Sequence, residues 1–126
     1  MPSPNKTKAI HIRPLASGLW TIDPVELPTT VDGKVETIQR LVGGYFEVHT
    51  AKVARKNVLI YVHDEANNEG ERRGFVLGNS RHLLGSAVIV SAKKDADLEL
   101  SNKQLGNSLK LFELPAPPFH NPNTNA

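Results

Sequence analysis

Apolar residues along the chain follow two different periods, and the change from one to the other marks a boundary between elements. From position 35 they fall on one helical face at Val35, Ile38, Leu41 and Val42. Phe46 and Val48 then alternate with polar residues, as in a strand with one buried face. Gly43 and Gly44 separate the two patterns. We therefore expect a short amphipathic helix that ends at one of these glycines, because the left-handed backbone conformation that ends many helices favours glycine.

Alternating or continuous apolar runs predict β-strands elsewhere. The expected segments are 9–13, 18–27, 45–49, 57–64, 71–79 and 86–92. Pro24 cannot donate to a strand ladder, so its strand should lie at an edge or end there. The nearly unbroken apolar run in 57–64 favours an interior position, and residues 86–92 have the composition of a buried strand.

Polar residues at the ends of the apolar runs give the remaining elements. Asp32 is a candidate N-cap for the first helix. Ser101 and Gln104 have the spacing of a capping box, which predicts a short helix through Leu105 and Leu109. "SRHLLG" should form a helical turn or a loop. The sequence thus predicts an α+β fold, a small single domain with a mixed or antiparallel β-sheet, one packed helix and a short C-terminal helix.

The two ends of the chain differ in composition from its middle. Residues 1–8 and 115–126 are rich in proline and polar residues and contain little to bury. We expect a disordered N-terminal tail over 1–8, a single α+β domain over 9–114, and a disordered tail rich in proline and asparagine over 115–126.

The composition of the chain excludes several kinds of chemistry. The 126 residues contain no cysteine, which rules out a disulfide, a thiolate metal site and a cysteine nucleophile. The formal net charge is only +2, and positive residues commonly stand beside acids. Charge alone therefore indicates a solvated surface with local basic spots and gives no sign of a nucleic-acid stripe.

Targeting signals are also absent from the pattern. The basic start "MPSPNKTK" is not followed by the apolar region of a signal peptide. No stretch approaches the roughly 20 apolar residues that span a bilayer. We expect a cytoplasmic protein without a membrane partner.

Three segments in this order carry a family resemblance: "VETIQRLVGGYFEV", "NNEGERRGFVLGN" and "GSAVIVSA". Together they resemble domain-of-unknown-function family 3846, whose members are encoded mainly by bacteriophages and mobile elements. The "LVGGY" piece is the most specific part. The resemblance implies a small protein made in the host bacterial cytoplasm during phage infection or by an integrated element. It implies no particular activity.

Two constellations suggest catalysis or metal binding, and neither has the required spacing. His49 and His63 could meet across a hairpin, but a zinc site needs three or four convergent ligands. Acidic residues from Asp64 to Glu71 surround a turn, where charges are usually only solvated. The serines and glycines match no nucleophile or phosphate-loop motif. We expect no catalytic residue, no metal and no cofactor, and an enzyme is less favoured than a binding protein.

The most suggestive cluster lies in "RRGFVLGNSRH", residues 72–82. Its candidate ligand-binding residues are Arg72, Arg73, Phe75, Asn79, Arg81 and His82. Positive donors beside an aromatic ring suit a nucleotide or a single strand. The alternative is structural: the arginines balance nearby acids, Phe75 fills the core and Asn79 makes a turn.

The leading hypothesis is a small non-enzymatic accessory binding protein of phage type. It would inhibit host defence by sequestering a nucleotide-like small molecule or a host protein. A nucleic-acid-binding accessory protein is the alternative, and a small hydrolase is a third hypothesis. Self-association into a homo-oligomer stays open at this point.

Overall fold

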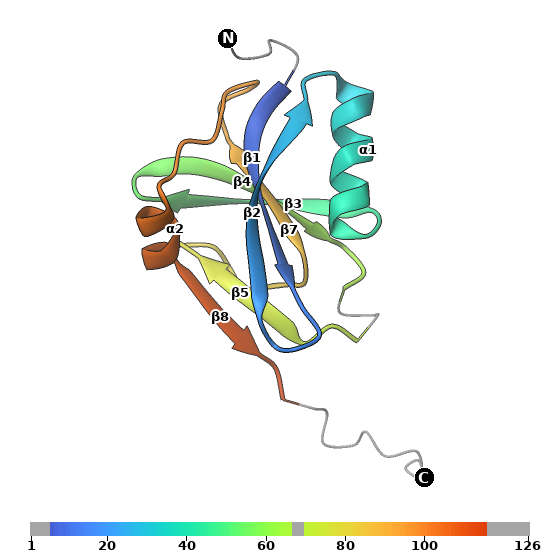
Figure 1. Ribbon diagram of the computed structural model, residues 1–126, viewed down its shortest axis with the longest axis vertical. Coiled ribbons are helices and arrows are strands. Elements are labelled where there is room, and N and C mark those ends of the chain that lie inside the picture. The colour runs from blue at the N-terminus through green and yellow to red at the C-terminus, as the bar shows by residue number, and fades with distance from the viewer. Residues whose placement is uncertain (1–5, 67–69, 116–126) are drawn as a thin grey trace.

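The computed structural model describes residues 6–66 and 70–115, which form strands and two helices (Figure 1). In chain order the elements are β1 (Lys6–Pro14), β2 (Trp20–Pro28), α1 (Val31–Val42), β3 (Phe46–Val53), β4 (Lys56–His63), β5 (Arg73–Leu77), β6 (Leu83–Leu84), β7 (Ala87–Ser91), α2 (Asn102–Ser108) and β8 (Leu109–Glu113).

The larger sheet has five antiparallel strands in the order β2-β1-β7-β4-β3. Pro24 and Pro28 lie on β2, which is an edge strand, as expected from Pro24. The apolar strand β4 lies inside the sheet, between β7 and β3. Ala54 and Arg55 connect β3 to β4 with positive φ angles of 50° and 69°, which suits a tight hairpin turn.

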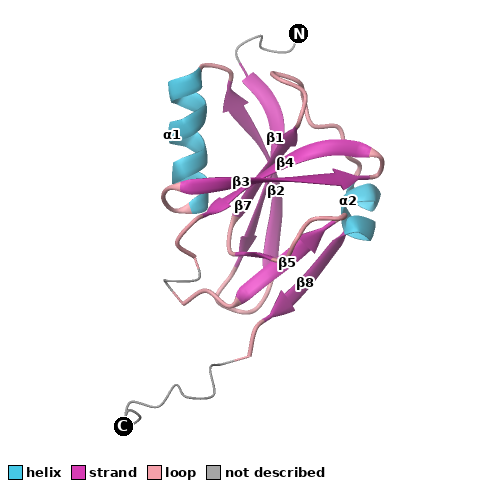
Figure 2. Ribbon diagram, turned by 180° about the vertical axis from the view of Figure 1, so that it is seen from behind, coloured by secondary structure: helices cyan, strands magenta, loops and turns pink. Residues whose placement is uncertain are grey.

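A smaller antiparallel sheet, β6-β5-β8, covers one face of the larger one. The alternation along β7 shows how both faces are used. Ala87 and Ile89 belong to the core that also contains Phe75 and Leu77 of the small sheet, whereas Val88 belongs to the core beneath α1. The larger sheet is therefore the middle layer, with α1 on one face and the small sheet with α2 on the other (Figure 2).

Helix α1 is fixed at both ends by backbone chemistry. The predicted N-cap, Asp32, was wrong: the Thr30 side chain caps the helix by accepting a hydrogen bond from the Gly33 N–H at 3.3 Å. Asp32 lies in the first turn, where its charge complements the helix dipole. Gly43 ends the helix with a φ of 102°, as predicted, and its N–H donates to Gln39.

The α+β class, the antiparallel pairing, the packed helix and the short C-terminal helix are confirmed. The capping box of Ser101 and Gln104 is present. In the C-terminal half, the structure differs from the prediction at two places. The helical pattern through Leu109 stops at Ser108, because Leu109 begins β8 and pairs with Leu77. Within the segment expected to be a helical turn or a loop, Leu83 and Leu84 form the short strand β6.

The predicted domain limits lie partly outside the residues that the structure describes. Strand β1 begins at Lys6, so residues 6–8 extend the first strand instead of belonging to a tail. The remaining residues of both predicted tails, 1–5 and 116–126, lie outside the described residues, and Pro115 follows β8. Neither helix in the described ranges has the length and apolarity to cross a membrane.

Candidate functional site

Arg73, the most engaged member of the predicted cluster, is held by its own neighbours. Its guanidinium donates to both carboxylate oxygens of Glu71, at 2.9 and 3.0 Å, and to the carbonyl oxygen of Leu15. Hydrogen bonding to Glu71 raises the pKa of Arg73. Burial would raise the pKa of Glu71, but the hydrogen bonds and charge of Arg73 lower it below its usual value. This pair joins β5 to the β1–β2 turn.

Phe75 and Asn79 also have structural roles. Phe75 is fully buried and packs edge-on against Trp20, with ring centroids 6.1 Å apart. Its ring therefore presents no stacking face at the surface. The Asn79 side-chain oxygen accepts the backbone N–H of Lys52 at 2.7 Å, which ties the turn after β5 to the edge strand β3.

Arg72, Arg81 and His82 are exposed, as is Asn79. Arg72 lies 3.8 Å from Glu113, and the His82 ring contacts Phe112 edge-on at 5.1 Å. Arg81 and His82 line a hollow of about 260 Å³. Glu47, His49 and Asp64 also line it, so carboxylates outnumber the guanidinium there. The structure thus brings two of the predicted residues together, but in surroundings that disfavour an anion.

The two histidines considered for a metal site both line this hollow, but they belong to opposite faces of the β3–β4 hairpin. The His49 ring nitrogen Nε2 lies 2.6 Å from Glu47, on the face of β3 that carries the buried Ala51. His63 lies on the other side of the hairpin, next to Gly44, where an added Cβ would be 2.6 Å from its Nε2. Across residues 6–66 and 70–115, no three His, Asp or Glu side chains are grouped to hold a metal ion.

A more basic hollow lies beside α1, on the other face of the larger sheet. We name it the lysine cleft and define it by Lys34, Lys93, Lys94, Leu59, Tyr61 and Val90. Its volume is about 190 Å³. Leu59 and Tyr61 of β4 and Val90 of β7 are only partly buried because α1 does not cover the whole sheet face, and they form an apolar floor.

The cationic rim of the lysine cleft comes from two distant segments. Lys34 lies on α1, and Lys93 and Lys94 lie on the loop that follows β7. The ammonium of Lys34 is 3.6 Å from the carboxylate of Asp95, the only acid among the cleft-lining residues of the described chain. Three lysines against one aspartate leave the cleft with a formal excess of positive charge.

Backbone hydrogen bonds hold the loop that carries Lys93 and Lys94. At its start, the Ala92 N–H donates to the Asn57 carbonyl at 3.1 Å. At its end, the Leu98 N–H donates to the Lys8 carbonyl at 2.9 Å, and the Asp97 carboxylate accepts the Lys8 N–H at 2.8 Å. Both ends of the loop are thus tied to the sheet, which restricts where its lysines can lie.

Tyr61 gives the floor of the lysine cleft a polar atom. Its ring contacts Phe46 edge-on, with centroids 5.0 Å apart, and burial raises the pKa of its phenol above the usual 10.0. At neutral pH the hydroxyl therefore stays protonated and can donate a hydrogen bond. A tyrosine and three lysines therefore line one small hollow.

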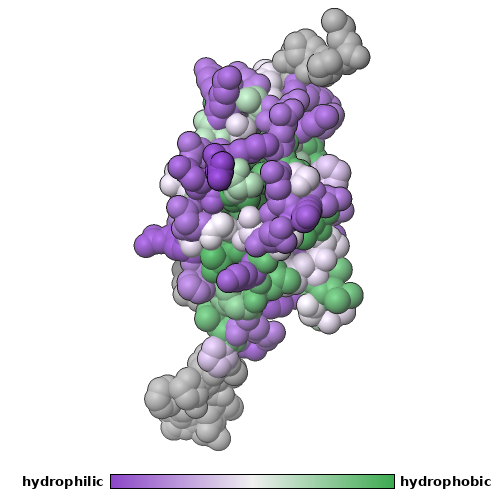
Figure 3. All heavy atoms as spheres, turned by 90° about the vertical axis from the view of Figure 1, so that its left-hand side faces the viewer, coloured by the Kyte–Doolittle hydropathy of each residue, from purple (hydrophilic) through white to green (hydrophobic). Residues whose placement is uncertain are grey.

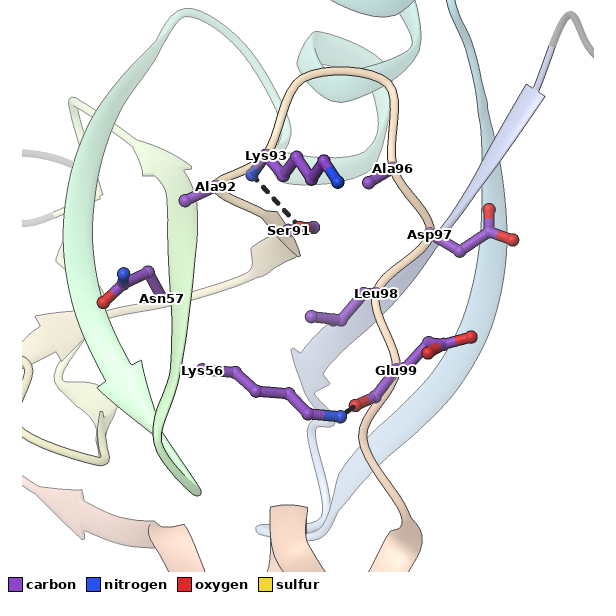
Figure 4. Close-up of a pocket in the computed structure, with 9 residues that line it drawn as sticks. All are labelled: Lys56, Asn57, Ser91, Ala92, Lys93, Ala96, Asp97, Leu98 and Glu99. Carbon is purple, nitrogen blue, oxygen red and sulfur yellow. Dashed lines mark hydrogen bonds between the residues drawn. The ribbon is translucent and has the colours of Figure 1, made fainter.

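A second, wider hollow lies on the other side of the same loop (Figure 4). It measures about 750 Å³ and is lined by Lys56, Asn57, Lys93 and neighbouring residues. The Lys56 ammonium donates to the Glu99 carbonyl, and the Asp97 carboxylate points away from the hollow (Figure 4). Lys93 lines both hollows. Figure 3 shows the side of the molecule that lies on the left in Figure 1, and the upper part of this surface is mostly hydrophilic.

Sequence reasoning missed the lysine cleft. The only local signal was the pair Lys93–Lys94 after a predicted strand. Its third lysine, Lys34, stands far away in the sequence and reaches the cleft only because α1 packs on the sheet beside β7. No spacing rule could have joined these residues.

The fold and the cleft together define a small α+β domain in which a helix and a second sheet enclose a five-stranded antiparallel sheet. The chain belongs to the domain-of-unknown-function family DUF3846, which it matches over residues 19–113. The membership expected from the "LVGGY" segment is confirmed, and the match includes all three cleft lysines. No curated protein and no solved structure matches the chain.

Proposed function

We propose that this protein is a non-enzymatic binding protein that holds a nucleotide-like anion in the lysine cleft. The observation that carries the proposal is the meeting of Lys34, Lys93 and Lys94 above a partly buried apolar floor. Ligand sites in proteins are commonly apolar hollows with a few convergent polar groups. This cleft has that composition.

The parts of the cleft suit the parts of a nucleotide. The ring of Tyr61 with Leu59 and Val90 offers apolar contact to a base or a sugar edge. The ammonium groups of Lys93 and Lys94 can bind phosphate oxygens through charge-assisted hydrogen bonds. The adjoining open hollow shares Lys93 and gives room for a ligand larger than 190 Å³.

Binding without turnover fits the side chains around the cleft. Lysine ammonium groups and the protonated Tyr61 hydroxyl hold an anion but are poor general bases at neutral pH. The carboxylate of Asp95 is 3.6 Å from Lys34, and this ion pair disfavours its use as a base. These properties favour sequestration over hydrolysis.

The biological role we infer rests on the phage and mobile-element context that the family resemblance implies. A small protein that sequesters a nucleotide-like signal would inhibit a host defence that depends on that signal. In this role the protein acts in the host bacterial cytoplasm, and its partner is the small molecule itself.

The test is isothermal titration calorimetry against nucleoside mono-, di- and triphosphates, cyclic dinucleotides, short oligonucleotides and inorganic phosphate. Loss of one charge-assisted contact typically weakens binding by about ten- to a hundredfold. We expect Lys93→Ala and Lys94→Ala each to do so with the melting temperature unchanged. Lys103→Ala is the matched control, because Lys103 is also exposed but lies on α2 and does not line the cleft.

The remaining hypotheses predict different results in the same experiments. Binding of oligonucleotides alone, with an affinity that falls steeply with salt, would favour the nucleic-acid-binding alternative. Consumption of any nucleotide would favour a hydrolase. If no ligand in the panel binds, or if both lysine variants bind as tightly as the wild type, the lysine cleft is not the site.

A further inference from the structure

Strand β3 has an open hydrogen-bonding edge. The Tyr45 carbonyl accepts from the Asp64 N–H at 3.0 Å, so odd-numbered residues of β3 face β4. Even-numbered residues therefore direct their backbone groups outward. Of these, Lys52 donates its N–H to Asn79. No acceptor within the described part of the chain meets the N–H groups of Phe46, Val48 and Thr50.

The other edge of the larger sheet is different. Strand β2 carries Pro24 and Pro28, which lack an N–H group and so discourage further pairing. Strand β3 has no proline, and Val48, at the middle of its open stretch, is 50% exposed. An exposed edge with an apolar side chain is a template for another strand.

We propose that two copies of this chain pair through β3 to form an antiparallel, two-fold symmetric dimer. The two-fold axis passes beside Val48, so Val48 lies opposite the partner's Val48. Phe46 then lies opposite the partner's Thr50, and their outward backbone groups complete the ladder. The five-stranded sheets become one continuous sheet across the interface.

Complementary acidic and imidazole side chains favour a second copy as the occupant of this edge. In this register Glu47 lies opposite the partner's His49, and the symmetry repeats the pair on the other side of the axis. Within one chain these two side chains already attract each other, at 2.6 Å. A carboxylate directly across from an imidazole can pair with it by a hydrogen bond, and by opposite charge when the imidazole is protonated, whereas two like charges would repel.

The Asn79 cap limits the length of the dimer ladder. Asn79 already accepts the N–H of Lys52, so this N–H cannot bond to the partner strand. The dimer ladder therefore ends before Lys52. Such a short contact buries less than the roughly 800 Å² per partner of a standard stable interface. The dimer should therefore exchange with monomer as the protein is diluted.

Sedimentation velocity over a wide concentration range tests the proposal on the full chain. We expect the 13.8 kDa chain to shift from monomer to dimer as its concentration rises. Val48→Lys puts two positive charges at the two-fold axis and should abolish the shift. Val31→Lys is the matched control: Val31 is 75% exposed but lies on α1, so this variant should dimerise like the wild type.

Amide hydrogen exchange gives a second measurement that needs no variant. In the dimer the amides of Phe46, Val48 and Thr50 become protected, so their exchange should slow as protein concentration rises. A chain that stays monomeric at every concentration overturns the proposal. So does a dimer that Val48→Lys leaves intact, that Val31→Lys disrupts equally, or that forms without protecting these three amides.

Discussion

Segment 72–82 is rich in candidate binding residues in the sequence, but the structure uses several of them to hold the fold. For the loop 92–97 the reverse is true. The first packs three arginines, a histidine and an aromatic ring into a short stretch, yet Arg73, Phe75 and Asn79 are engaged in holding the fold. The second offers only Lys93 and Lys94, yet α1 brings a third lysine to them above an apolar floor.

This difference shows that candidate binding residues that are close in the sequence need not meet at one site in the structure. Arg73 and Phe75 lie on the same face of β5, but Glu71 binds the guanidinium and the core encloses the ring, so neither side chain is available to a ligand. Phe75 points into the core, while Arg81 and His82 lie beyond the strand end at a hollow with two carboxylates. Side chains from a helix and a loop meet more readily, because both can border the same uncovered part of a sheet.

The largest effect in this comparison should come from Phe75. Phe75→Ala removes a fully buried ring from the core and should lower the free energy of unfolding by about 3–5 kcal/mol. Urea denaturation measures it. Leu111→Ala is the control, since Leu111 pairs with Phe75 in register but is 50% exposed, and its loss should be much smaller. A stable Phe75→Ala variant that loses ligand binding would instead make this ring part of a site.

Several features of the fold could be predicted because their causes are local. The helix end at Gly43 follows from its apolar spacing and the left-handed turn, and the edge position of β2 follows from Pro24. The division into two sheets could not be predicted, since it depends on β8 pairing with β5 far back in the sequence. The lysine cleft depends on the same kind of long-range packing.

A smaller effect should follow from removing the guanidinium that joins β5 to the β1–β2 turn. Arg73→Ala leaves the Glu71 carboxylate without its side-chain donors and should lower the free energy of unfolding by about 1–3 kcal/mol at neutral pH. Chemical denaturation at several pH values measures this loss.

The pH dependence of the Arg73→Ala effect has a definite sign. Burial alone would raise the pKa of Glu71, but its bonds to Arg73 lower it below the ordinary 4.5. A lowered pKa in the folded state adds stability above pH 4.5, and that contribution is lost as the pH falls through the folded value. The difference between wild type and Arg73→Ala should therefore shrink in acid. A difference that grows in acid contradicts this role for the pair.

Asn79 should matter less, because its hydrogen bond lies at the surface. Asn79→Ala frees the Lys52 N–H and should destabilise the protein by about 0.5–1.5 kcal/mol. Thermal unfolding measures the loss, and Asn79→Asp, which keeps the accepting oxygen, should recover most of it. If the aspartate variant is no more stable than the alanine variant, the cap on β3 does not contribute to stability.

The smallest change in stability should come from Arg72→Ala and Arg81→Ala. Arg72 faces Glu113 at 3.8 Å in an exposed pair, and Arg81 lines an open hollow, so each substitution should alter the free energy of unfolding by less than about 0.5 kcal/mol. Because neither residue lines the lysine cleft, both variants should bind the anion that we propose for it like the wild type. Calorimetry with the ligand panel decides between the two regions. A ten- to hundredfold loss in Arg81→Ala, with binding intact in Lys93→Ala and Lys94→Ala, would place the site in segment 72–82.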